Sequence, residues 1–103
     1  MTYEEILQGL KKKVAEDPLE GTAVYQFRLS GEEGGDFYVD VVEGKSQVHE
    51  GLAEEPHLTV SMTVGDFNAL AEGKMSTTSA FFSGKIKIKG DMSLALKLQG
   101  LLG

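Results

Sequence analysis

Three segments of the chain alternate apolar and polar residues, and this period-two pattern limits the fold more than any other feature of the sequence. The segments cover residues 22–30, 36–41 and 57–64. Successive side chains of a β-strand point to opposite faces of its sheet, so alternation is typical of a strand with one buried and one polar face. The pattern therefore predicts a β-sheet whose apolar face is covered by other elements.

Turn residues connect these strands and delimit two more. Residues 32–35 (EEGG) join the first two alternating segments into a hairpin, and Glu43-Gly44 leads into a weaker strand at residues 47–52. These three strands are expected to form an antiparallel meander that Glu54-Glu55-Pro56 ends. A fifth strand is predicted at residues 85–89, after Gly84.

Helical signals fall before, between and after the strands. Thr2 and Glu5 have the spacing of a capping box, and apolar residues then recur at helical intervals until Asp17-Pro18. Thr63 and Asp66 repeat that spacing ahead of a short helix ending near Gly73, and a further turn is predicted at residues 76–82. With a terminal helix from Asp91, the predicted order is α-β-β-β-β-α-α-β-α.

The terminal helix carries more apolar residues than one sheet face can bury. They occupy more than one stripe of the helix surface, at Met92, Leu94, Ala95, Leu96, Leu98, Leu101 and Leu102. Either the helix is sandwiched between the sheet and other helices, or part of its surface lines a cavity or groove for another molecule.

Charge and composition exclude several classes of function. The net charge of −6 argues against nucleic acid as a partner, because such binding depends on basic residues meeting phosphates. The chain has no cysteine, which excludes disulfides and thiolate-bound metals. The first residues lack the pattern of a signal peptide, and no apolar run approaches transmembrane length. A soluble, cytoplasmic protein is expected.

Several linked motifs in the second half resemble one known family. They are GKM at residues 73–75, SAFFSGK at 79–85, IKIKGDM at 86–92, Leu94-Ala95 and Lys97-Leu98-Gln99. Together they closely resemble the sterol carrier protein type 2 domain, over nearly the whole chain and most sharply from Leu58 onward. The resemblance implies an α+β fold with a five-stranded, mainly antiparallel sheet, helices packed on one face, and a crossover between the third and fourth strands.

The same resemblance implies a function for residues 1–103 as one lipid-binding domain. Members of the family hold sterols, fatty acids or fatty acyl-CoA in an apolar tunnel between sheet and helices, without a cofactor. The ligand-binding residues that we expect are Phe27, Met62, Phe67, Leu70, Met75, Phe81, Phe82, Ile88, Met92, Leu94, Ala95, Leu98, Gln99 and Leu102.

The sequence departs from the family pattern in two places. Met75 is followed by Ser76-Thr77-Thr78, where many members have proline and an amide-bearing residue, so the next helix is expected to begin differently. The sequence also stops at Leu101-Leu102-Gly103 without the peroxisomal targeting tripeptide. A cytoplasmic, prokaryotic member of the family is expected.

The roles of individual side chains have simpler alternatives. Phe81 and Phe82 either wall a lipid cavity or fill an ordinary core, and methionines at 62, 75 and 92 adapt to a ligand or fill gaps. Lys85, Lys87 and Lys89 attract an anion or membrane surface, or form a solvated strand face. Gln99 binds the polar end of a ligand or faces solvent.

Two competing functions follow from the residues. An enzyme would need a general base, for which Asp66, Asp91 or His57 are the candidates, and each has a capping or surface explanation. His49 and His57 lack metal-ligand spacing, so neither a metal site nor a catalytic residue is predicted. The second alternative is a module in which the terminal helix docks on a partner or forms a homodimer; transient membrane contact is a further alternative.

Overall fold

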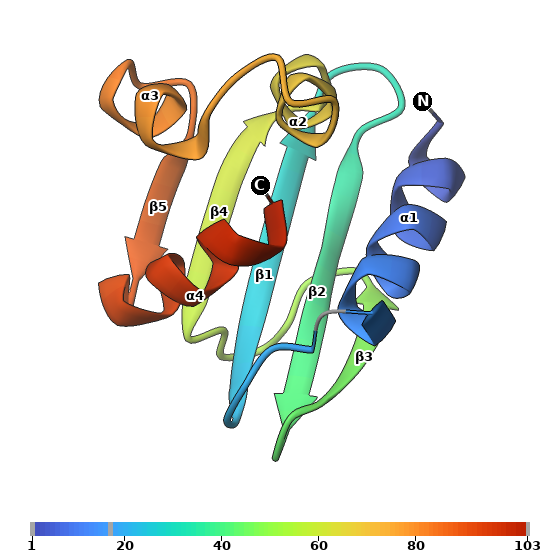
Figure 1. Ribbon diagram of the computed structural model, residues 1–103. Helices are drawn as coiled ribbons and strands as arrows, with labels where there is room; N and C mark the ends of the chain where they lie inside the picture. The colour runs from blue at the N-terminus through green and yellow to red at the C-terminus, as the bar shows by residue number, and fades with distance from the viewer. Residues whose placement is uncertain (1, 17, 103) are drawn as a thin grey trace.

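The computed structural model describes residues 2–16 and 18–102, with the side chains of 99–102 excepted. Within these residues the chain forms five strands and four helices (Figure 1). In order they are α1 (Tyr3–Glu16), β1 (Ala23–Ser30), β2 (Gly35–Val42), β3 (Lys45–Glu50), β4 (Leu58–Thr63), α2 (Val64–Ala71), α3 (Thr77–Phe82), β5 (Lys87–Gly90) and α4 (Met92–Leu102). The predicted order of elements is confirmed.

The five strands form one sheet in the order β3-β2-β1-β4-β5. The central pair, β1 and β4, is parallel, and the other three pairs are antiparallel. In Figure 1, α1 and α4 lie in front of the sheet, and α2 and α3 lie at the end where β1 and β4 finish. This arrangement confirms the expected α+β fold with a mainly antiparallel sheet and a crossover after the third strand.

The predicted caps start the helices where the sequence placed them. The backbone N–H of Glu5 donates to Thr2 Oγ1 at 3.2 Å, and the Thr2 N–H donates to Glu5 Oε1 at 3.1 Å, which makes a reciprocal capping box. Thr63 Oγ1 likewise accepts from the N–H of Asp66 at 3.1 Å. Because Thr63 is the N-cap, Val64 belongs to α2, not to the strand.

The third strand begins and ends two residues earlier than predicted. It covers Lys45–Glu50, whereas the sequence pattern placed it at residues 47–52. Gly51 has a φ of 101° and its N–H donates to the carbonyl oxygen of Asp36 at 2.8 Å, so the chain turns away from the sheet edge there. Leu52 consequently lies in the crossover and is exposed.

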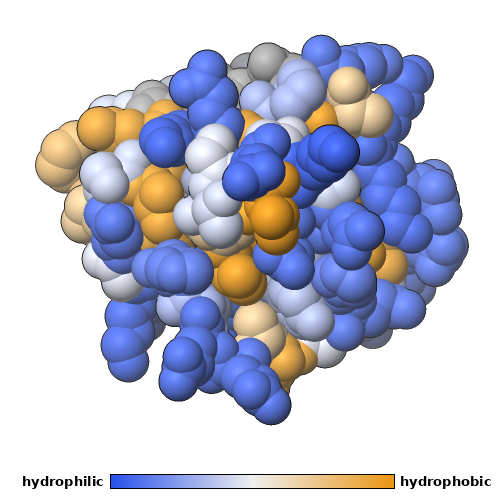
Figure 2. Space-filling model, turned by 90° about the horizontal axis from the view of Figure 1, so that it is seen from below, coloured by the Kyte–Doolittle hydropathy of each residue, from blue (hydrophilic) through white to orange (hydrophobic). Residues whose placement is uncertain are grey.

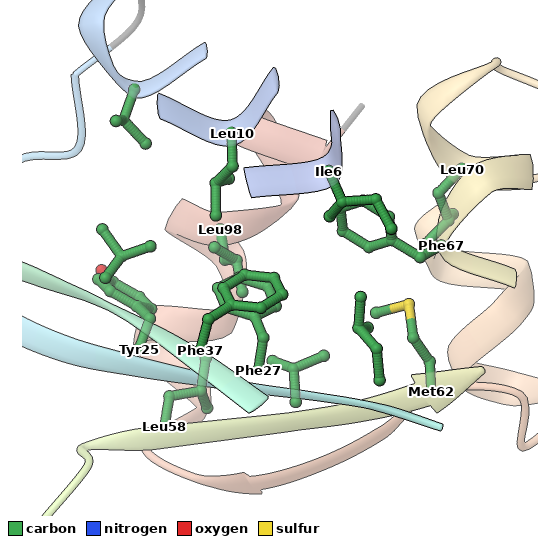
Figure 3. Close-up of a cluster of buried hydrophobic side chains, with 14 of the residues drawn as sticks. Ile6, Leu10, Tyr25, Phe27, Phe37, Leu58, Met62, Phe67, Leu70 and Leu98 are labelled. Atoms are coloured by element: carbon green, nitrogen blue, oxygen red, sulfur yellow. The ribbon is translucent and has the colours of Figure 1, made fainter. Parts of the chain in front are cut away.

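The core lies between the inner face of the sheet and the helices. Its strand residues are the alternate apolar ones of β1, β2 and β4, and α1 covers them with Ile6, Leu7, Leu10 and Val14. Figure 3 shows Leu10 of α1 and Leu98 of α4 pointing toward the aromatic rings of the sheet. The rings of Phe27 and Phe37 are stacked with centroids 5.1 Å apart. Each such buried ring contributes about 1.5–3 kcal/mol to folding.

The crossover from β3 to β4 passes across the opposite face of the sheet, behind β2 and β1 in Figure 1. Gln26, on that face, is covered by it and is only 2% exposed. Its Nε2 donates to the carbonyl oxygens of Phe37 and Gly51 at 3.0 and 3.2 Å, and its Oε1 accepts from the N–H of Ala53 at 2.7 Å. Alternation places Gln26 on the polar face, but the crossover buries it there, and its hydrogen bonds hold the crossover to the sheet.

Candidate functional site

The core is covered unequally along the sheet. On the α1 side, the four large aliphatic residues of the helix are all buried. On the α3 and α4 side, by contrast, Phe82 and Leu96 are 81% and 73% exposed, and Phe81 and Met92 are exposed as well. Figure 2, viewed from below, shows apolar surface gathered mainly on the β5 and α4 side and in the middle, whereas the α1 and β3 side is mostly polar.

The predicted ligand-binding residues fall into four groups. Those buried in the core are Phe27, Met62, Phe67, Leu70 and Leu98. Those partly buried against it are Met75, Ile88, Leu94 and Ala95. Those exposed are Phe81, Phe82 and Met92. Gln99 and Leu102 lie outside the side chains that the structure describes. Of the predicted residues with described side chains, all but Phe27 of β1 lie on the part of the chain from β4 to α4.

Helix α3 presents both its aromatic residues to the outside. Ser76 caps the helix, its Oγ accepting from the N–H of Ser79 at 3.1 Å, so the serine that departs from the family pattern still starts a helix. Ala80 is the buried residue of α3, whereas Phe81 and Phe82 are exposed with ring centroids 5.7 Å apart. The side chains that would wall a cavity are therefore the least covered aromatic ones among the described residues.

Asp91 and His57 hold the start of α4 to the sheet. The Asp91 Oδ1 accepts from the Oγ and N–H of Ser93 at 2.6 and 2.9 Å, and these hydrogen bonds hold the pKa of Asp91 below its usual value. His57 Nδ1 accepts from the N–H of Val24 at 3.0 Å, and its carbonyl oxygen accepts from the N–H of Asp91 at 3.0 Å. Asp66 takes part in the α2 cap through its backbone N–H, so the candidate bases whose side chains have structural roles are His57 and Asp91.

Tyr25 is a candidate that sequence reasoning missed. Its side chain is fully buried on the inner face of β1, and its hydroxyl has no hydrogen-bond partner among the described residues. Burial raises the pKa of this hydroxyl, and the negative charge of Asp91 raises it further. The signal was present in the sequence, since Tyr25 is the one hydroxyl-bearing residue in the inward series Ala23, Tyr25, Phe27 and Leu29.

A polar groove of about 660 Å³ lies at the end of the sheet near α2. The Lys85 and Ile86 N–H groups donate to the carbonyl oxygen of Ala80 and not to β4. The last residues of β4 therefore have no partner strand on the β5 side, and the groove lies there. Arg28 in its wall is paired with Asp36 at 3.2 Å, whereas Lys85 and Lys87 form no ion pair with any described residue. The groove extends from Lys85 and Lys87 to the end of the sheet near α2.

The described part of the chain has neither a metal-ligand cluster nor a membrane-spanning helix. No group of three His, Cys, Asp or Glu residues there is arranged to hold a metal ion. None of the described helices has the length and apolar character that crossing a bilayer requires.

Comparison with known proteins identifies the family. Residues 4–103 match the model of the SCP-2 sterol transfer family. The chain belongs to this family. Solved structures of sterol carrier proteins are also similar to it in fold, so the family resemblance seen in the sequence motifs is confirmed. The SCP-2 domain is a lipid-binding domain, and its fold is the one described above.

Relatives of this SCP-2 family member include longer proteins. Hydroxysteroid dehydrogenase-like protein 2 of Xenopus tropicalis is 44% identical over 102 residues, which are 97% of this chain and 24% of the relative. Human sterol carrier protein 2 is 36% identical, over 98% of this chain and 19% of the relative. The chain therefore spans about a quarter or less of the length of these curated relatives.

A solved structure of similar length matches almost all of the chain. It is the solution structure of palmitated SCP2L2 from Aedes aegypti, which is 27% identical. The match has a TM-score of 0.81 and covers 99% of this chain and 95% of the other.

Proposed function

We propose that residues 1–103 act as one domain that binds and carries an apolar lipid, such as a fatty acid, fatty acyl-CoA or sterol-like molecule, between the inner sheet face and helices α2–α4. The observation that carries this proposal is the unequal covering of the core. Apolar side chains of α3 and α4 remain exposed next to a core that is closed on the α1 side. A lipid placed against them would complete the covering.

The energetics of burial support such a ligand. Each methylene removed from water contributes about 0.8 kcal/mol, so a long acyl chain can bind after the cost of ordering it is subtracted. Covering the exposed side chains of Phe82 and Leu96 with a ligand adds binding free energy in the same way, because their apolar surface also leaves water. The palmitate on the Aedes aegypti relative shows that a protein of this fold accommodates an acyl chain.

The proposed role involves no chemical step. Two of the side chains that a general base would be drawn from are engaged in hydrogen bonds, because His57 Nδ1 accepts from the N–H of Val24 and Asp91 Oδ1 accepts from Ser93. Asp66 takes part in the α2 cap through its backbone N–H. The fourteen predicted ligand-binding residues remain predictions, and the exposed ones, Phe81, Phe82 and Met92, are those whose exposure a lipid would change most. Brief contact of the exposed Phe82 with a bilayer surface would bring the proposed site to its ligand.

The exposed residues of α3 and α4 also support a second candidate function, a homodimer. Two copies packed through Phe82 and Leu96 would bury the same apolar surface without a ligand. Sedimentation velocity with and without lipid separates the two functions. A dimer that persists after delipidation favours association, and a monomer that copurifies with lipid favours carriage.

The test of lipid carriage uses a matched pair of exposed apolar residues. Phe82→Ser should weaken binding of a fluorescent fatty acid to the delipidated protein about tenfold, because it removes apolar surface next to the ligand. Leu52→Ser removes a comparably exposed apolar side chain from the crossover on the opposite face, and should leave affinity unchanged. The dissociation constants are measured by fluorescence titration.

Lipid carriage would be refuted if neither acyl nor sterol probes bound saturably to the wild-type protein. Equal losses in the Phe82 and Leu52 variants would instead place the ligand elsewhere than under α3.

A further inference from the structure

The core contains a hydroxyl group that packing does not require. The Tyr25 side chain is 0% exposed, and its oxygen has no hydrogen-bond partner among the described residues. We propose that the Tyr25 hydroxyl binds the polar end of the lipid and selects ligands whose polar atom is an uncharged hydroxyl or carbonyl oxygen. This inference rests on the proposed lipid carriage and names the ligand class for the same site.

The position of Tyr25 gives the apolar core a polar end. Tyr25 pairs with Leu58 on β4, and Leu58 pairs with Gly90 on β5, so Tyr25 lies in the row of residues that leads to the start of α4. In Figure 3 its oxygen lies at the end of the cluster opposite Met62 and Phe67. Leu58 and Met62 are four residues apart, about 13 Å along a strand. An amphiphile of that length or more would find a hydroxyl at one end and apolar side chains at the other.

Without a ligand, the buried hydroxyl of Tyr25 lowers the stability of the fold. A buried polar group with no hydrogen bond destabilises the fold, because it has lost its bonds to water. A phenylalanine would fill nearly the same space without that cost. A ligand oxygen beside Tyr25 would accept a hydrogen bond from the hydroxyl and remove this penalty. The free energy that the hydroxyl costs the empty protein is then recovered when the ligand binds.

The charge near the hydroxyl argues against an ionised ligand. The carboxylate of Asp91 acts on the Tyr25 hydroxyl electrostatically and raises its pKa, as burial does. Tyr25 therefore stays protonated and is available as a donor to a hydroxyl or carbonyl oxygen. A carboxylate or phosphate at the same place would be repelled by Asp91 and would lose its hydration in the core. An uncharged polar end fits both conditions.

The test combines Tyr25→Phe with three fluorescent probes of different polarity: parinaryl alcohol, parinaric acid and the hydrocarbon diphenylhexatriene. Delipidated wild-type protein should bind the alcohol more tightly than the ionised acid at pH 8. In Tyr25→Phe, affinity for the alcohol should fall roughly fivefold, the equivalent of one hydrogen bond, while affinity for diphenylhexatriene stays the same. The Tm of the empty variant should rise by a few degrees.

Tyr38→Phe is the control, because it removes a hydroxyl from the half-buried outer face of the neighbouring strand. It should change none of the three affinities. If Tyr25→Phe and wild-type protein bind the alcohol equally, the hydroxyl takes no part in binding and the inference is overturned. It is also overturned if affinity for the hydrocarbon falls as much as that for the alcohol, since that marks a packing role. Absence of binding by all three probes would refute lipid carriage itself.

Discussion

At the scale of single residues, Gln26 is the polar group on which the crossover depends. Its amide bonds to the backbone of β2 and to both Gly51 and Ala53, in a place where water is excluded. Gln26→Met keeps the length of the side chain but leaves the Ala53 N–H and the Gly51 carbonyl without these partners. We expect the free energy of unfolding to fall by about 2 kcal/mol, measured by urea denaturation.

Gln47→Met provides the matched control for Gln26. Gln47 is exposed on the edge strand β3, and its replacement should change the free energy of unfolding by less than about 0.5 kcal/mol. Similar values for the two variants would mean that the buried hydrogen bonds contribute nothing beyond those of a surface amide.

Asp91 gives the stability of the fold a dependence on pH. Its native pKa is lowered, first by the hydrogen bonds from Ser93. The stabilisation is therefore complete well above the unfolded pKa of about 3.9, and is lost as pH falls from there through the lower native value. Asp91→Ala should have a lower Tm than wild type at pH 7, and the difference should shrink by pH 3.

Glu54→Ala removes the same charge from an exposed position in the crossover and serves as the control for Asp91. Its Tm difference from wild type should be small at both pH values. A Tm difference for Asp91→Ala that stayed constant from pH 7 to pH 3 would show that the loss comes from packing and not from the ionised cap.

Tyr25 and Gln26 mark what alternation can predict about a residue. The pattern assigned each to the correct face of β1, because side-chain direction depends only on local geometry. It did not predict that Gln26 is buried, since a segment 25 residues later covers it. Nor did it reveal that the Tyr25 hydroxyl lacks a partner, because that depends on every neighbouring element.

At the scale of elements, Gly90 fixes how β5 leads into α4. Its φ is 119°, and an added Cβ would meet the carbonyl oxygen of His57 and the Cα of Leu58 in the paired strand. Gly90→Ala should therefore reduce the free energy of unfolding by about 3 kcal/mol. The value is measured by urea denaturation.

Gly51 distinguishes the two causes of the expected loss of stability at Gly90, which are backbone strain and the clash of a Cβ with β4. It has a φ of 101°, but an added Cβ would have no atom within 4 Å. Gly51→Ala thus reports backbone strain alone, about 1 kcal/mol. If both variants lost the same free energy, the close approach of β4 to Gly90 would have no energetic consequence.

Helix starts were predictable from the sequence, whereas strand pairing was less so. The caps at Thr2 and Thr63 need only residues three positions apart, and both formed as expected. The end of β3 depended on the turn at Gly51 and was misplaced by two residues. The parallel contact of β1 with β4 joins distant segments and was not predicted, since the family resemblance implied only a crossover between the third and fourth strands.

At the scale of the whole molecule, the two sides of the core should differ in stability. Helix α1 buries all four of its large aliphatic residues, whereas α3 and α4 leave several large apolar residues exposed. Amide hydrogen exchange of the delipidated protein should be faster in α3 and α4 than in α1. Adding a bound lipid should slow exchange in α3 and α4 most, because those helices would gain the contacts.

The β1 and β2 amides provide an internal reference for the exchange measurement, since the strands are paired on both sides. Equal slowing in every element would indicate a general rise in global stability, as expected when ligand binding acts only through the unfolding equilibrium. Slower exchange in α1 but not in α3 and α4 would contradict the proposed site.

The sequence predicted which part of the chain has apolar residues that the core does not bury, but not which of those residues are exposed. The excess of leucine in the terminal helix indicated that some apolar residues lacked a place in the core, and α4 does leave Met92 and Leu96 exposed. Which residues those would be depends on the angle at which α4 crosses the sheet. The same uncertainty holds for α3, where Ala80 packs inward and Phe82, two residues later, is exposed.

The position of β4 between β1 and β5 has a consequence for how the chain acquires its fold. The partners Tyr25 and Leu58 are separated by more than thirty residues, so their pairing closes a long loop, whereas the β1–β2 and β2–β3 hairpins form locally. Non-local pairing slows folding. When only β1–β3 of a nascent chain have emerged from the ribosome, one edge of β1 is unpaired and can pair with neighbouring chains. Synthesis of the second half supplies β4, which covers this edge and removes the aggregation hazard.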